Sequence, residues 1–128
     1  MSGTLDRGNV LVDPNVQTVT IQYASTTAGD QATPVLPAVA GKKIRIFAIA
    51  ATTNIGGTNF YLRNGAGGSA VTEMYYRAIS GSPSAAYYSR VGYPGIFLYE
   101  TLVGVALTLN CTTAGAQVSV SLSYSYVV

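Results

Sequence analysis

The last twelve residues of the chain, 117–128, alternate strictly between apolar and small polar side chains over most of their length. Every second position is apolar, with serines between: Val118, Val120, Leu122, Tyr124 and Tyr126. In a strand, successive side chains point to opposite faces of the sheet. One face of this segment therefore enters a core and the other carries small hydroxyls, which is typical of an antiparallel sheet.

Further segments predict strands with the same alternation. They cover residues 16–23, 42–51, 59–64, 71–79 and 104–110. The core-facing residues expected in three of them are Val19, Ile21, Tyr23, Phe60, Leu62, Val105, Leu107 and Leu109. Residues 32–40 carry two prolines, which favours an extended edge or a connection.

Segment 42–51 is the strongest candidate for a central strand. We expect one apolar face made of Ile44, Ile46, Ala48 and Ala50, and a second made of Phe47 and Ile49. Apolar residues on both faces indicate a strand whose second face is also covered. Residues 86–99, rich in tyrosine, glycine and proline, predict an irregular loop instead.

Together these segments predict an all-β fold: a one-domain antiparallel β-sandwich of seven or eight strands with no substantial helix. The domain is expected to span residues 16–128. Residues 1–15 are polar and lack a sustained period, so we expect an N-terminal extended arm there. A disordered terminus is the alternative, and Val10, Leu11 and Val12 favour an arm that docks on a partner.

Charge is scarce in this chain. Charged residues make up 9% of it, against about 25% in an ordinary domain. Either uncharged polar residues keep the surface soluble, or partners cover much of it; the ten tyrosines favour the second interpretation. The net charge of +2 is too small to indicate nucleic acid or a membrane surface as a partner.

The residue types needed for catalysis and metal binding are almost missing. The chain has no histidine, one cysteine and five carboxylates, so we expect no enzyme, no metal site and no cofactor. Cys111 is interpreted as a small buried residue, with an intersubunit disulfide as the alternative. Glu73 and Glu100 are expected to pair with Arg77 or Arg63, and not to flank a sugar.

Three further features of the sequence are a glycine-rich segment, the composition of the N-terminus and the length of the apolar stretches. The glycine-rich segment 64–69 is followed by a predicted strand and not by a helix, so it predicts a hairpin turn and not a phosphate site. The N-terminus lacks the charged start and apolar run of a secretory signal. No stretch approaches about eighteen apolar residues, so no membrane span is expected.

The candidate interface combines aromatic, basic and apolar residues. Tyrosine joins a large apolar area to a polar end, which suits subunit contacts; core packing and sugar stacking are the alternatives. A solvated strand start is the alternative for the basic cluster. The set comprises Tyr75, Tyr87, Tyr88, Tyr93, Lys42, Lys43, Arg45, Val10 and Leu11.

Three segments, in order, resemble the small jelly-roll-like β-sandwich proteins of tailed-bacteriophage virions. They read AGKKIRI at 40–46, GVALTL at 104–109 and YSYVV at 124–128. The resemblance spans roughly residues 40–128 and defines no functional residues. It implies a virion structural protein, in particular a capsid decoration or cement protein that binds the major capsid protein at capsomer junctions, often as a homotrimer. A receptor-binding or tail-tip module that recognises host sugars through tyrosine-rich loops is the alternative.

Overall fold

The computed structural model describes residues 4–5, 11–12, 16–76, 86–91 and 97–128, and it describes the backbone alone for 4–5, 11–12, 76 and 86–91. The described part contains strands and turns and no helix. In chain order the strands are β1 (Thr4–Leu5), β2 (Leu11–Val12), β3 (Gln17–Tyr23), β4 (Gly29–Asp30), β5 (Lys43–Thr53), β6 (Asn59–Asn64), β7 (Tyr75–Tyr76), β8 (Ala86–Val91), β9 (Tyr99–Glu100), β10 (Leu107–Cys111) and β11 (Val118–Val127).

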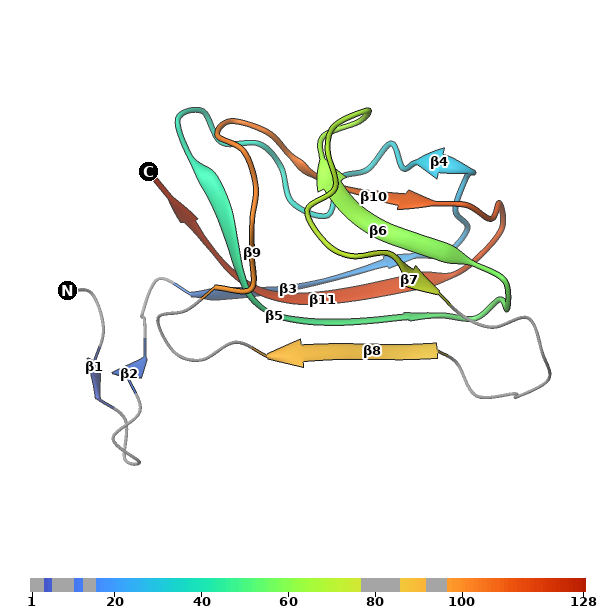
Figure 1. Cartoon of the computed structure of the whole chain (residues 1–128), viewed down its shortest axis with the longest axis horizontal. Coiled ribbons are helices and arrows are strands. Elements are labelled where there is room, and N and C mark those ends of the chain that lie inside the picture. Colours follow the sequence, from blue (N-terminus) through green and yellow to red (C-terminus); the bar gives the residue numbers. More distant parts are fainter. Residues whose placement is uncertain (1–3, 6–10, 13–15, 77–85, 92–96) are drawn as a thin grey trace.

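Two antiparallel sheets form the body of the molecule, one above the other in Figure 1. The lower sheet has the order β3-β11-β5-β8, with β9 also paired to β5, and the upper sheet has the order β4-β10-β6-β7. From β3 to β11 the chain changes sheet at every step except β6–β7 and β8–β9. This strand order is that of a jelly roll. The prediction of an all-β antiparallel sandwich is confirmed.

The core lies between the two sheets and draws on both. Its most deeply buried large side chains belong to β5, β6, β10 and β11: Ile44, Ile46, Ile49, Phe60, Leu62, Leu107, Leu109, Val118 and Val120. The alternation predicted for the last strand is confirmed from Val118 to Tyr124 and is broken after it, where Ser125 is buried. The serines between Val118 and Tyr124 lie on the outer face, where Ser121 and Thr20 join their hydroxyls at 2.8 Å.

One residue in β5 changes which side chains face the core. Ser123 pairs with Ala48 and Tyr124 pairs with Ile46, so Phe47 is an extra residue without a partner on β11. Such a β-bulge reverses the alternation of the strand that carries it. The expectation that Ala48 and Ala50 share the core face with Ile46 is therefore wrong. Ile49 and Ala51 face the core after the bulge, and β5 bends sharply along its length in Figure 1.

The strand predicted at 71–79 is shorter than expected. Only Tyr75–Tyr76 is paired, residues 71–74 bend over β6, and 77–79 lie outside the described residues. The hydroxyl of Thr72 accepts a hydrogen bond from the backbone N–H of Leu62 at 3.0 Å. A side chain thus takes the place of a strand partner.

Two other boundaries also differ from the sequence prediction. The loop expected at 86–99 was wrong, because β8 pairs with β5 over six residues, Ala86 to Val91. Tyrosine and valine favour strands when a sheet offers them a neighbour. The strand expected from residue 104 begins only at Leu107, after a turn in which Gly104 has a φ of 73°.

Candidate binding surface

The predicted tyrosine interface does not come together in the structure. Tyr75 is 4% exposed, and its ring meets that of Phe60 edge-on at 5.3 Å, so it belongs to the core. The prediction that Tyr75 lies at an interface was wrong because β7 pairs with β6 and turns this side chain inward. The backbone of Tyr87 and Tyr88 lies in β8 and not in a loop.

The remaining tyrosine and arm residues of the prediction are largely outside the description. Tyr93 and Val10 lie outside the described residues, as do the side chains of Tyr87 and Tyr88. The backbone of Leu11 pairs with Leu5 in the small β1–β2 hairpin. Whether the arm docks on a neighbour stays a prediction.

Two of the three cations in the predicted basic cluster share one carboxylate within the chain. Glu100 on β9 accepts the Nζ of Lys43 at 3.1 Å and the Nε of Arg45 at 2.7 Å. The hydrogen bond from Arg45 is the main reason that the pKa of Glu100 is lowered. The guanidinium of Arg45 also lies 4.6 Å from the ring centre of Phe97. Of the three predicted basic contacts, Lys42 is exposed, and Lys43 and Arg45 are half-buried.

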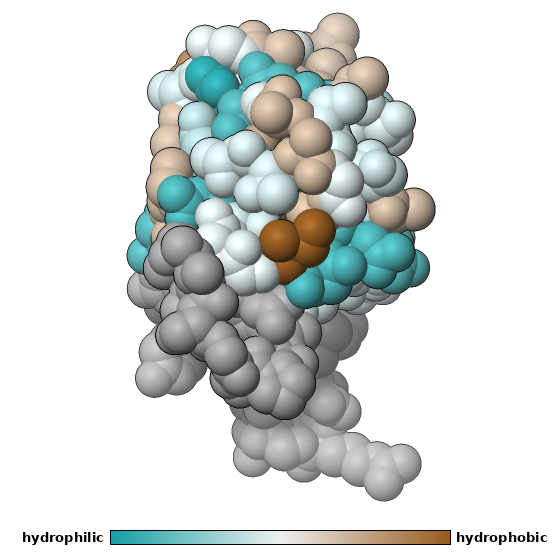
Figure 2. Space-filling model, turned by 90° about the vertical axis from the view of Figure 1, so that its right-hand side faces the viewer, coloured by the Kyte–Doolittle hydropathy of each residue, from teal (hydrophilic) through white to brown (hydrophobic). Residues whose placement is uncertain are grey.

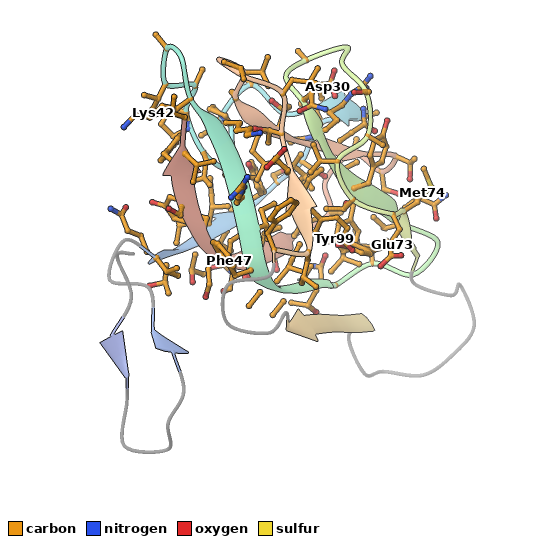
Figure 3. All side chains as sticks on the ribbon, turned by 60° about the vertical axis from the view of Figure 1, so that its left-hand side comes forward. Asp30, Lys42, Phe47, Glu73, Met74 and Tyr99 are labelled. Carbon is orange, nitrogen blue, oxygen red and sulfur yellow. The ribbon has the colours of Figure 1, made fainter. Side chains whose placement is uncertain are left out.

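The ion-pair partner predicted for Glu100 was wrong, and Arg77, one of the partners predicted for Glu73, lies outside the described residues. Glu100 pairs with β5, as above, because β9 lies beside that strand. Glu73 accepts a hydrogen bond from the hydroxyl of Tyr99 at 3.1 Å, and Figure 3 shows the two side by side. Arg63 pairs with Asp30 at 3.2 Å.

Asp30 fastens the glycine-rich turn to the upper sheet. One carboxylate oxygen accepts hydrogen bonds from Asn110 at 2.9 Å and from Arg63 at 3.2 Å, and the other accepts the N–H of Gly67 at 2.9 Å. The hydrogen bond from Asn110, followed by those from Gly67 and Arg63, lowers the pKa of Asp30. Asn64 N–H closes the turn on the carbonyl of Ser69 at 2.8 Å. The predicted hairpin turn is confirmed.

One end of the sandwich exposes large apolar side chains on hydrogen-bonded turns. Val39 is 37% exposed, Leu102 61% and Val103 58%. We call these three residues the apolar tip. They belong to the β4–β5 and β9–β10 connections, which rise together at the upper left of Figure 1. A cluster of exposed apolar residues is more informative than single ones, because clusters mark binding surfaces.

Backbone hydrogen bonds hold the apolar tip in place. The N–H of Gly104 donates to the carbonyl of Lys42 at 2.7 Å, and the N–H of Leu102 donates to the Asn64 side chain at 2.8 Å. The hydroxyl of Tyr126 donates to the carbonyl of Pro37 at 2.6 Å. The β4–β5 connection, the β9–β10 connection, the glycine-rich turn and β11 therefore meet at the apolar tip. A surface that is already ordered loses little entropy on binding.

An exposed cation lies beside the apolar tip. Lys42, at the end of β5 in Figure 3, is exposed in the turn that carries Val39. Figure 2 draws the opposite side of the molecule, on the right of Figure 1, which mixes hydrophilic and near-neutral residues with one small strongly hydrophobic spot. The tip thus combines three apolar side chains with one cation, which suits an apolar partner surface with an acidic group at its margin.

Sequence reasoning missed the apolar tip, although a signal was present. Leu102 and Val103 are adjacent and are followed by Gly104. Two consecutive apolar residues cannot both face one core from a strand, and a glycine directly after them favours a turn. That combination predicts an exposed apolar side chain.

Within the described ranges, no three histidine, cysteine, aspartate or glutamate side chains lie close enough together to hold a metal ion. Cys111 is fully buried, as predicted, and its thiol is free. Those ranges also contain no helix long and apolar enough to cross a membrane.

Comparisons with known proteins leave the chain without a family. No protein-family model and no curated protein matches the sequence. One solved structure with a similar arrangement comes from work describing Bacillus endospore appendages that form a novel family of disulfide-linked pili. It is 12% identical and covers 84% of this chain and 86% of that chain, with a TM-score of 0.36. A likeness at this level assigns neither a family nor an activity.

Proposed function

We propose that this protein is a structural subunit of a virion, in particular a capsid decoration protein that docks through the apolar tip. The tip is the observation that carries the proposal. Val39, Leu102 and Val103 are exposed on turns that hydrogen bonds hold in place. Covering each one contributes on the order of 1 kcal/mol to association, provided that the partner surface is complementary.

The mechanism is non-covalent clamping. A subunit that docks across the junction between capsomers adds contact area, and that area must be exposed again before the shell can open. Because the subunit binds the assembled shell and not its dispersed parts, mass action favours assembly. This role needs no catalytic group and no cofactor. The part of the proposal that names a virion and its major capsid protein rests on the sequence resemblance.

Two further properties support a binding role. The chain has few charges, as expected when partners cover part of the surface. Its jelly-roll topology recurs in viral capsid and lectin domains, although a fold alone fixes no function. The alternative, sugar recognition by tyrosine-rich loops, loses support because Tyr75 is buried and the Tyr87–Tyr88 backbone is a strand.

A capsid-binding assay tests the proposal. Purified, labelled protein is mixed separately with emptied, expanded capsids of the source virus and with its host cells, and bound protein is measured after sedimentation. We expect saturable binding to capsids and a rise in the temperature at which they open. Binding to host cells without binding to capsids would replace the proposal with the receptor-binding alternative.

A further inference from the structure

Among the described residues, the two sheets have four edges, and three of these edges carry features that discourage further pairing. The upper sheet ends in β4 and β7, which have two residues each. The lower sheet ends in β8 on one side, and β8 contains Arg90. Short edge strands and edge charges are devices that keep sheets from joining. The fourth edge, β3, has neither.

β3 presents an open edge seven residues long. It spans Gln17 to Tyr23 and contains no charge, no proline and no glycine. Within the part of the chain that the structure describes, its backbone forms hydrogen bonds only with β11. Its outer-face residues Thr18, Thr20 and Gln22 are exposed. Such an edge leaves a row of backbone donors and acceptors available to another strand.

The sequence of β3 is complementary to itself in the antiparallel direction. Its polarity is symmetric about Thr20 over residues 18–22. If two copies align antiparallel at this residue, Thr18 stands opposite Gln22, Val19 opposite Ile21, and Thr20 opposite Thr20. Directly opposed residues in an antiparallel pair share a face. Over these five residues polar side chains therefore meet polar ones on the outer face, apolar ones meet apolar ones on the core side, and no like charges meet; at the two ends Gln17 stands opposite Tyr23.

We infer that β3 is a self-association surface, and that its partner is β3 of a second copy of this chain, related by a two-fold axis through Thr20. Pairing would join the two lower sheets into one continuous sheet, with Val19 and Ile21 of both copies extending the apolar layer. The interface is isologous, so it closes after two subunits. The inference does not depend on what the apolar tip binds. A dimer differs from the trimer that the sequence resemblance implies.

The mass of the full chain in solution is the first test. Sedimentation equilibrium over a wide concentration range is expected to give twice the monomer mass for the native protein. The change Thr20→Lys places two like charges across the axis and should weaken the dimer about tenfold or more. The matched control is Ala50→Lys, which adds the same charge to the outer face of central strand β5. The control should leave the mass unchanged.

Two double variants at positions 18 and 22 test the register of the β3–β3 pairing and control for misfolding. Residue 18 faces residue 22 of the partner, so Thr18→Lys combined with Gln22→Lys should give a folded monomer. Thr18→Lys combined with Gln22→Glu places opposite charges across the interface and should restore a dimer that high salt weakens. Circular dichroism confirms folding of each variant. A native chain that is monomeric throughout, a trimer that Thr20→Lys does not change, or equal behaviour of the two double variants would overturn the inference.

Discussion

At the scale of single residues, the turns at the end of the sandwich rest on a few contacts that tolerate little change. Asp30 connects β4 to β10, β6 and the glycine-rich turn, and Asn64 connects that turn to Leu102 in the apolar tip. The sequence predicted the turn but not these contacts, because Asp30, Arg63 and Asn110 are far apart along the chain. Only the strand order brings them together.

Replacing Gly68 with alanine should strongly destabilise the protein. The added Cβ would fall on the carbonyl oxygen of Asn64, well inside van der Waals contact, so the turn must open. We expect a loss of about 3 kcal/mol in the free energy of unfolding, measured by urea denaturation. The control is Gly41→Ala, where φ is +75° and nothing lies within 4 Å; there only backbone strain of about 1 kcal/mol applies. Equal losses would show that the close approach at Gly68 is unimportant.

The Asp30 carboxylate should make the free energy of unfolding decrease at acidic pH. Its pKa in the folded chain lies below the ordinary value of 3.8 because Asn110, Gly67 and Arg63 stabilise the ionised form. The stabilisation is therefore present above about pH 5 and disappears as the pH falls through the unfolded and then the folded pKa. We expect Asp30→Asn to be less stable at pH 7 and to lose less stability on acidification.

Urea denaturation of both proteins from pH 7 to acid tests this expectation. Glu100 also has a lowered pKa, caused mainly by Arg45, so part of the acid sensitivity should remain in Asp30→Asn and should fall further when Glu100→Gln is added. Parallel stability profiles for the native chain and Asp30→Asn would contradict the assignment of Asp30.

At the scale of elements, the alternation of apolar and polar residues predicted which segments are strands better than it predicted where each strand begins and ends. β3, β6 and β11 could be read from the sequence because each has one buried face with a period of two. The bulge at Phe47 could not be read from the sequence. Both faces of β5 are rich in apolar residues, so the pattern fits a regular strand and a bulged strand equally well. β8 was missed for a related reason, since its pairing depends on the neighbouring β5 and not on a local pattern.

Deleting Phe47 should be tolerated, because Phe47 is the extra residue of the bulge. Without it, Ile46 still lies opposite Tyr124 and Ala48 opposite Ser123, so the ladder becomes regular and Ile49 keeps facing the core. We expect this deletion to cost about 1 kcal/mol for the lost half-buried side chain. Deleting Ala50, which has a partner on β11, should cost about 4 kcal/mol or more, because it turns core residues on one side of the deletion to the outer face. Urea denaturation compares the two deletions, and similar stabilities would contradict the role of the bulge.

At the scale of the whole molecule, the fold class followed from the sequence and the binding surface did not. Strand alternation and the absence of helix signals are properties of many residues, so errors in single segments do not change the sandwich. The apolar tip depends on two connections from different parts of the chain that meet through hydrogen bonds. The tyrosine-based prediction failed at Tyr75 for the same reason, because composition does not show on which side of a strand a residue lies.

The most direct test of the apolar tip is a comparison of folding and association in one variant. Leu102→Ser combined with Val103→Ser removes most of its exposed apolar area. Met74→Ser is the control, because Met74 is 55% exposed and lies across the molecule from Lys42 in Figure 3. The double variant should keep the native unfolding midpoint and bind emptied capsids about tenfold more weakly or worse, while the control binds as the native chain does. A double variant that binds capsids as tightly as Met74→Ser does would contradict the account.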